Sequence, residues 1–175
     1  GFINLGKALL KESNPPKLAN IFLSHYHWDH IFGFLGFAPF FNPMNTFNIY
    51  GKPDKKSPKE ILEYILDYTF WPVDLNMLSA KINLNNFPNS NLDLGGNISV
   101  SSIKHGHPNG ANSYRLEIGN KIIVYSTDWL YILHLTRIHS GRLANNIYGS
   151  RCTIREFNNN DNVLLLLREY RDIKH

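Results

Sequence analysis

The stretch Leu23-Ser24-His25-Tyr26-His27-Trp28-Asp29-His30, LSHYHWDH, places three histidines and one aspartate within six consecutive positions. It overlaps the end of the segment from Ala19 to Ser24, whose centre is a short apolar run typical of a buried strand. The sequence therefore predicts that side chains of the kinds that bind metals gather where a buried strand ends.

The spacing within this stretch favours a metal site over a surface turn. His25 and His27 are two residues apart, so an extended backbone points them to the same side, and a following turn can bring Asp29 and His30 to an adjacent point. Four such ligands can serve two neighbouring metal ions. Imidazole and carboxylate suit zinc and also iron or manganese, so the residue types leave the metal open. In a surface turn these histidines would be solvated, but packing gives no reason to place four polar groups beside an apolar strand.

Two later residues extend the candidate site. His107 follows the predicted strand Ile98–Ile103, and Asp128 follows the predicted strand Lys121–Tyr125. Two cations about 3.5–4 Å apart repel each other, and a shared carboxylate offsets this repulsion. Asp128 is a candidate for that bridge, although its sequence context also fits an ordinary turn.

The third imidazole has two candidates, His105 and His107. We favour His107, because Pro108 and Gly110 fix its backbone at a sharp turn. His105 is then expected to face solvent or to support a ligand.

Strand and helix patterns alternate along the chain and predict an α/β or α+β domain. Ser57 and Glu60 form a capping box that predicts a helix ending before Trp71-Pro72. Gly119-Asn120 predicts a type II′ hairpin turn. The predicted strands are Ala19–Ser24, Phe47–Tyr50, Lys81–Leu84, Ile98–Ile103, Tyr114–Ile118 and Lys121–Tyr125.

Length and composition suit one domain with a substantial core: 175 residues, of which 43% are hydrophobic and 13% aromatic. The longest apolar stretch, Ile31–Phe41, is interrupted by glycine and proline and is shorter than the ~20 residues of a membrane helix. No membrane partner and no secretion signal are indicated, so we expect a cytoplasmic location. The net charge of +4 favours an anionic partner. The densest basic patch of the chain, Lys52–Lys59, is interpreted first as a solvated loop and second as a nucleic acid contact.

Across His25–His30 the chain resembles the metallo-β-lactamase-fold hydrolases, whose signature H-x-H-x-D-H corresponds to residues 25–30. It is most similar to the phosphodiesterase-like bacterial branch related to tRNase Z and cyclic phosphodiesterases. The pieces FNIYG, WPVDL, HPNG, NSYRLE and VYSTD also occur in the order expected of that branch. The resemblance covers residues 1–128, and residues 129–175 form a divergent C-terminal segment.

The resemblance implies an αββα sandwich, partial here, with the metals at the edge where strand-end loops meet. It also implies two divalent ions, expected to be zinc, with manganese or iron as alternatives. Asp29 is the expected catalytic group because it is placed to orient the attacking water. In the implied ligand set, the first ion is bound by His25, His27 and His107, the second by Asp29 and His30, and Asp128 bridges them.

The implied function is hydrolysis of a phosphodiester, such as a cyclic nucleotide or an RNA end, by a metal-activated water. The alternatives are a thioester hydrolase of the glyoxalase II type and a degenerate metal-binding fragment without turnover. The opening strands and a late histidine of the family are not recognised, which suggests a truncated or frame-altered chain that could form a homo-oligomer. Further imidazoles occur at His134, His139 and His175, where surface positions are expected.

Overall fold

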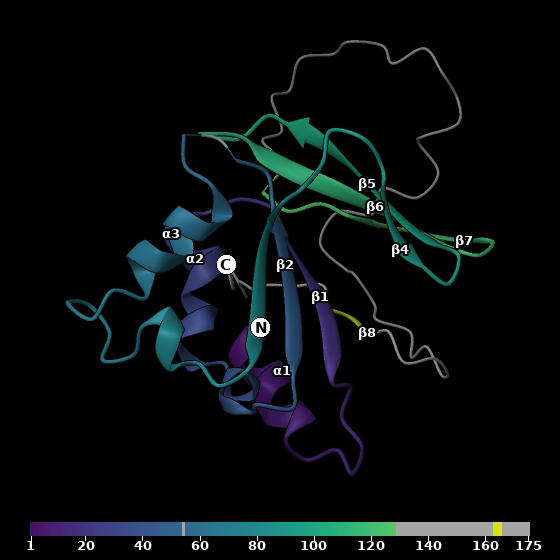
Figure 1. Cartoon of the computed structure of the whole chain (residues 1–175). Coiled ribbons are helices and arrows are strands. Elements are labelled where there is room, and N and C mark those ends of the chain that lie inside the picture. Colours follow the sequence, from purple (N-terminus) through teal and green to yellow (C-terminus); the bar gives the residue numbers. More distant parts are fainter. Residues whose placement is uncertain (54, 129–162, 166–175) are drawn as a thin grey trace, which may run out of the picture. The chain divides into compact units, whose positions relative to one another are not determined.

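The structure, a computed structural model, describes residues 1–53, 55–128 and 163–165. The chain divides into two compact units, the first comprising Gly1–Asn89 with Asn160–His175 and the second comprising Ser90–Asn159. In the described residues each unit contains a four-stranded sheet (Figure 1).

The sheet of the first unit is parallel, with the strand order β3-β2-β1-β8. Parallel strands need crossover connections, and the helical segments between β1, β2 and β3 supply them. The strands predicted around residues 19, 47 and 81 are confirmed. The strands are β1 (Leu18–Leu23), β2 (Thr46–Gly51), β3 (Lys81–Asn86) and β8 (Val163–Leu165).

Helices cover one side of β1 and β2, as Figure 1 shows for α1 and α3. Phe2 of α1 stacks on Phe37 with ring centroids 3.8 Å apart, and Phe40 packs edge-on to Phe47 of β2 at 4.9 Å. Phe34, Phe37 and Phe40 of the apolar stretch Ile31–Phe41 therefore contribute to the core of this unit. The helical segments are α1 (Phe2–Leu9), α2 (Trp28–Ile31), α3 (Pro58–Ile65) and the 3-10 turns η1 (Phe32–Gly36), η2 (Ala38–Phe41) and η3 (Leu75–Met77).

The predicted capping box at the start of α3 is confirmed. The Glu60 N–H donates to Ser57 Oγ at 3.2 Å, and the Ser57 N–H donates to the Glu60 carboxylate at 2.8 Å. The hydrogen bonds from the Ser57 backbone and hydroxyl lower the pKa of Glu60. The helix ends at Ile65, before Trp71-Pro72 as predicted. Beyond it, Asp67 accepts a hydrogen bond from the Thr69 N–H and turns the chain.

Three asparagines in register form a ladder across the parallel sheet. Asn20 pairs with Asn48, and Asn48 with Asn83. The Asn83 amide donates to Asn48 Oδ1 at 2.8 Å, and the Asn48 amide donates to Asn20 Oδ1 at 3.0 Å. Each bond satisfies a polar side chain of the sheet. This matters most for Asn20, which is only 6% exposed. The ladder therefore favours this strand register over a slipped one.

Replacing the central asparagine, Asn48→Ala, is expected to lower the free energy of unfolding by about 1–3 kcal/mol. The change removes the amide that donates to Asn20 Oδ1 and the oxygen that accepts from the Asn83 amide. Both groups then lose these hydrogen bonds. Equilibrium denaturation measures the effect, with Asn76→Ala on exposed η3 as the control. Equal effects of the two substitutions would contradict a stabilising ladder.

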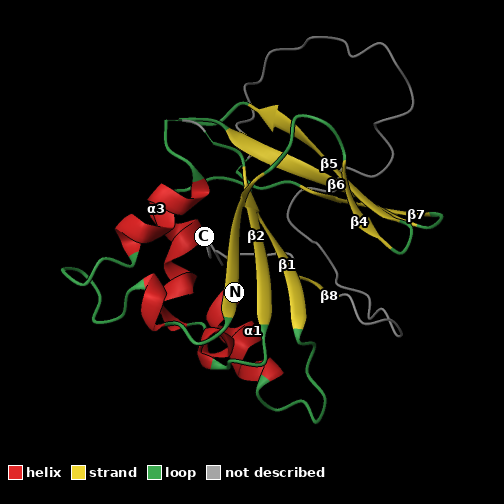
Figure 2. Cartoon of the chain, viewed as in Figure 1, coloured by secondary structure: helices red, strands yellow, loops and turns green. Residues whose placement is uncertain are grey.

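The second unit contains an antiparallel sheet in the order β4-β5-β6-β7 (Figure 2). The predicted hairpin is confirmed: Ile118 pairs with Lys121, and Gly119 has a φ of +57°. The preceding strand β4 was not predicted from the sequence. The strands are β4 (Leu92–Gly95), β5 (Ile98–His105), β6 (Ala111–Ile118) and β7 (Lys121–Tyr125).

The predicted mixed α/β class is confirmed by these elements. No helix in residues 1–53, 55–128 and 163–165 is both long enough and apolar enough to cross a membrane. The C-terminal segment, residues 129–175, lies outside the described residues except for β8. The same holds for its histidines, His134, His139 and His175.

Candidate metal centre

The histidine loop, defined as His25–His30, begins directly beyond β1, where Leu23 pairs with Gly51 of β2. His25 is buried, with 5% of its surface exposed. His27 keeps an extended backbone, with φ −64° and ψ 148°, and caps α2. Its carbonyl accepts the His30 N–H at 2.9 Å. The chain therefore turns into a helix immediately after His27, which carries Asp29 and His30 back toward the strand end.

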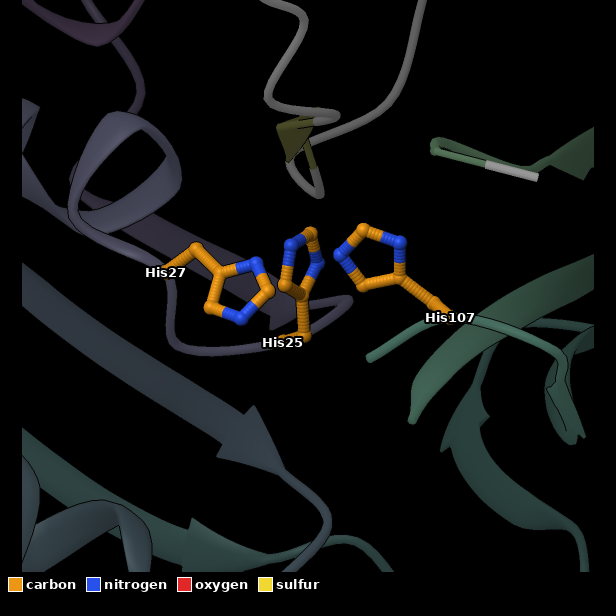
Figure 3. Close-up of side chains that lie close together, drawn as sticks. All are labelled: His25, His27 and His107. Carbon is orange, nitrogen blue, oxygen red and sulfur yellow. The ribbon is translucent and has the colours of Figure 1, made fainter. Parts of the chain in front are cut away.

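The three imidazoles of the loop lie together, as the sequence predicts. The ring centroids of His25 and His27 are 4.6 Å apart and nearly perpendicular, and those of His25 and His30 are 4.1 Å apart. Figure 3 shows the rings of His25 and His27 side by side. His30 Nε2 lies 3.7 Å from Asp29 Oδ2. This loop by itself thus gathers three nitrogen ligands and one carboxylate.

Ser24 supports the first imidazole through a contact that was not predicted from the sequence. Its hydroxyl oxygen lies 3.1 Å from His25 Nδ1 in a buried hydrogen bond. If His25 binds a metal through Nε2, its Nδ1–H must donate to Ser24, because a neutral imidazole carries one proton. Ser24 would then fix both the tautomer and the ring orientation.

Tyr26, between the first two histidines, connects the loop to β2. Its hydroxyl donates to the Lys52 carbonyl at 3.2 Å, and its ring end lies against Gly51. Burial raises the pKa of the Tyr26 hydroxyl, so the group keeps its proton and remains a donor. No role for Tyr26 was predicted from the sequence, although the glycine that closes the predicted strand was a signal for close packing there.

The second unit brings His107 and Asp128 together. β6 lies between β5 and β7 and runs antiparallel to both. The C-terminal ends of β5 and β7 therefore lie at the same end of the sheet. His107, also labelled in Figure 3, lies in the turn after β5 and Asp128 follows β7. The distance from His107 Nε2 to Asp128 Oδ2 is 3.9 Å. These two predicted ligands are therefore neighbours.

Backbone geometry confirms the turn that the sequence predicts at His107. The Gly110 N–H donates to the His107 carbonyl at 2.7 Å, and Asn109 and Gly110 have positive φ values of 64° and 77°. His107 is thus held in a tight turn, as predicted from the glycine. His105 is instead the last residue of β5, where it pairs with Ala111.

The chemistry of these side chains fits a divalent metal ion. Imidazole nitrogens and carboxylate oxygens are the ligands of zinc in proteins, and several other transition metals accept them. The candidate donors are His25, His27, Asp29 and His30 in the first unit and His107 and Asp128 in the second.

Comparison with protein families gives one match that includes both sets of donors. The family model described as "Beta-lactamase superfamily domain" matches residues 4–158. The chain belongs to this family. Membership confirms the predicted superfamily and its fold class.

One solved structure similar to the chain is that of the metallo-beta-lactamase fold protein YhfI from Bacillus subtilis. The two sequences are 26% identical, and the TM-score is 0.42. The similarity covers 62% of this chain and 40% of that chain, so the matched region is less than half of the YhfI structure. A comparison with curated proteins gave no significant match.

Proposed function

We propose that this chain carries the metal centre of a phosphodiester hydrolase. The observation that supports this most directly is the histidine loop. The ring centroids of His27 and His30 lie 4.6 and 4.1 Å from that of His25, at the end of a parallel strand. In a beta-lactamase superfamily domain, such a concentration of nitrogen ligands favours catalytic metal binding over a structural role.

We infer that the donors serve two ions, with His25, His27 and His107 on the first and Asp29 and His30 on the second. Asp128 would bridge them, because one shared carboxylate offsets the repulsion between two cations. Within each unit the neighbouring donors support this inference: Asp29 lies 3.7 Å from His30, and Asp128 lies 3.9 Å from His107. Bound ions would supply charge stabilisation to substrate oxygens and acidify a water molecule.

Asp29 is the residue that we assign to the water. Its side chain is 44% exposed, whereas that of neighbouring His30 is 12% exposed. An exposed carboxylate beside a less exposed imidazole can bind a metal ion with one oxygen and accept a hydrogen bond from water with the other. Asp29 thereby orients the attacking water and can accept its proton.

The basic patch, Lys52–Lys59, favours a phosphodiester over an uncharged substrate. Its backbone begins next to the histidine loop, where the Lys52 carbonyl accepts the Tyr26 hydroxyl. We propose that Lys52 and its neighbours attract the phosphate and the charged groups that flank it.

Hydrolysis of a phosphodiester chromogen, bis(p-nitrophenyl) phosphate, tests this proposal when it is compared with a thioester, S-lactoylglutathione. Both are measured on the full chain with added zinc or manganese. We expect metal-dependent cleavage of the phosphodiester and little cleavage of the thioester. The reverse preference would favour a thioester hydrolase, and bound metal without cleavage of either would favour a binding protein. Both of these results contradict the proposal.

A further inference from the structure

We propose that Tyr26 is a positioning residue, which sets the spacing of His25 and His27 by fastening the histidine loop to the end of β2. This inference rests on the proposed metal centre. It assigns a role to a residue that lies between two ligands and that would not itself contact the metal.

The attachment crosses from one strand to its neighbour. Leu23, the last residue of β1, pairs with Gly51, the last residue of β2. Both strands end at this pair. Beyond it, the Tyr26 hydroxyl links the two segments again by donating to the Lys52 carbonyl at 3.2 Å. The strand end that receives this bond is itself fixed, because the Phe87 N–H donates to the Gly51 carbonyl at 2.8 Å.

Gly51 leaves the space that the tyrosine occupies. A Cβ atom on Gly51 would meet the Tyr26 hydroxyl directly and would lie 3.1 Å from Tyr26 Cζ. Pro58 Cγ, at 3.3 Å, closes the other side, so the neighbouring atoms leave little room for an added methyl group. Glycine is therefore required here because the phenol ring passes so close to the backbone, and any larger residue would push Tyr26 out.

Fixing the middle residue restricts both ligands. In extended backbone successive side chains point to opposite sides, so Tyr26 faces β2 while His25 and His27 face the other way. The imidazole rings are 4.6 Å apart in this arrangement. Without the attachment, the loop backbone would sample more conformations, and a metal ion would have to order it on binding.

The test compares Tyr26→Phe, which removes the hydrogen bond and keeps the ring, with Gly51→Ala, which displaces the ring. Tyr50→Phe is the matched control, because Tyr50 lies on β2 next to Gly51 and its ring stacks on Phe22. The readouts are the dissociation constant for Zn²⁺, the absorption spectrum of the Co²⁺ form and the melting temperature of the metal-free chain.

We expect Tyr26→Phe and Gly51→Ala to weaken Zn²⁺ binding by about tenfold, the lower end of what loss of a ligand's support costs. The Co²⁺ spectrum should change in both variants, while Tyr50→Phe should match the wild type. A purely structural tyrosine would lower the metal-free melting temperature without changing the Co²⁺ spectrum, and that result would overturn the inference.

Two further outcomes separate this inference from the proposed function. If the wild type binds Zn²⁺ and Tyr26→Phe binds it equally well, only the positioning role is wrong. If the wild type does not bind Zn²⁺ or Co²⁺, the proposed metal centre fails, and the positioning role fails with it.

Discussion

His27→Gln is expected to weaken binding of the first metal ion by more than about 100-fold, beyond the effect of losing a supporting hydrogen bond. Glutamine keeps a polar side chain of similar length but offers an amide, which is a poor ligand for zinc. His27 also begins α2 with an extended backbone, which glutamine can adopt. We therefore expect the fold to persist while the metal is lost.

Equilibrium dialysis followed by elemental analysis measures this change, and thermal melting of the metal-free chain checks the fold. His105→Gln is the matched control, since it replaces a histidine that we place outside the ligand set. Unchanged affinity in His27→Gln would refute the metal site. A comparable loss in His105→Gln would show that His105 also belongs to the site, either as a ligand or as a support for one.

Asp128→Asn is expected to lower turnover by about 100-fold or more, since removing one preorganised charge-stabilising group commonly costs this much. The amide lacks the negative charge needed between two cations. Stability should change by less than about 1 kcal/mol, because Asp128 has a φ of 51° and asparagine is among the residues that tolerate this conformation. The substitution thus separates charge from backbone geometry.

Turnover of the phosphodiester chromogen and denaturant unfolding, measured on the same preparations, check this expectation. Asp93→Asn serves as the control, because Asp93 belongs to the same unit and accepts a backbone hydrogen bond from the Gly95 N–H at 2.8 Å. If Asp128→Asn turns over as fast as Asp93→Asn, then Asp128 is only a turn residue.

Local patterns predict the elements that frame the site. The apolar run before Ser24 predicts β1, the Ser57–Glu60 box predicts the start of α3, and Gly119 predicts the turn between β6 and β7. These signals depend on neighbours only a few residues apart, such as a cap, a turn or an alternation of side chains. Because the interacting residues are close together in the chain, one sequence is enough to find them.

Contacts between distant segments are not predictable in this way. Helix α1 depends on Phe2 packing against Phe37, and the hydroxyl of Tyr26 finds its acceptor at Lys52. Neither partner can be identified before the strands are placed side by side. The histidine loop was recognisable from its ligand-rich composition, whereas the contacts of Ser24 and Tyr26 required the tertiary structure.

The asparagine ladder also bears on the order of folding. Its two hydrogen bonds join residues 28 and 35 positions apart in the chain, whereas the β6–β7 hairpin closes across two residues. Closing the longer segments costs more chain entropy, so we expect the hairpin to gain protection before the parallel sheet does. Pulsed hydrogen exchange would show the opposite order if this is wrong. Because the histidine loop extends from β1, a metal ion that needs this loop would arrive late and would slow unfolding more than it speeds folding.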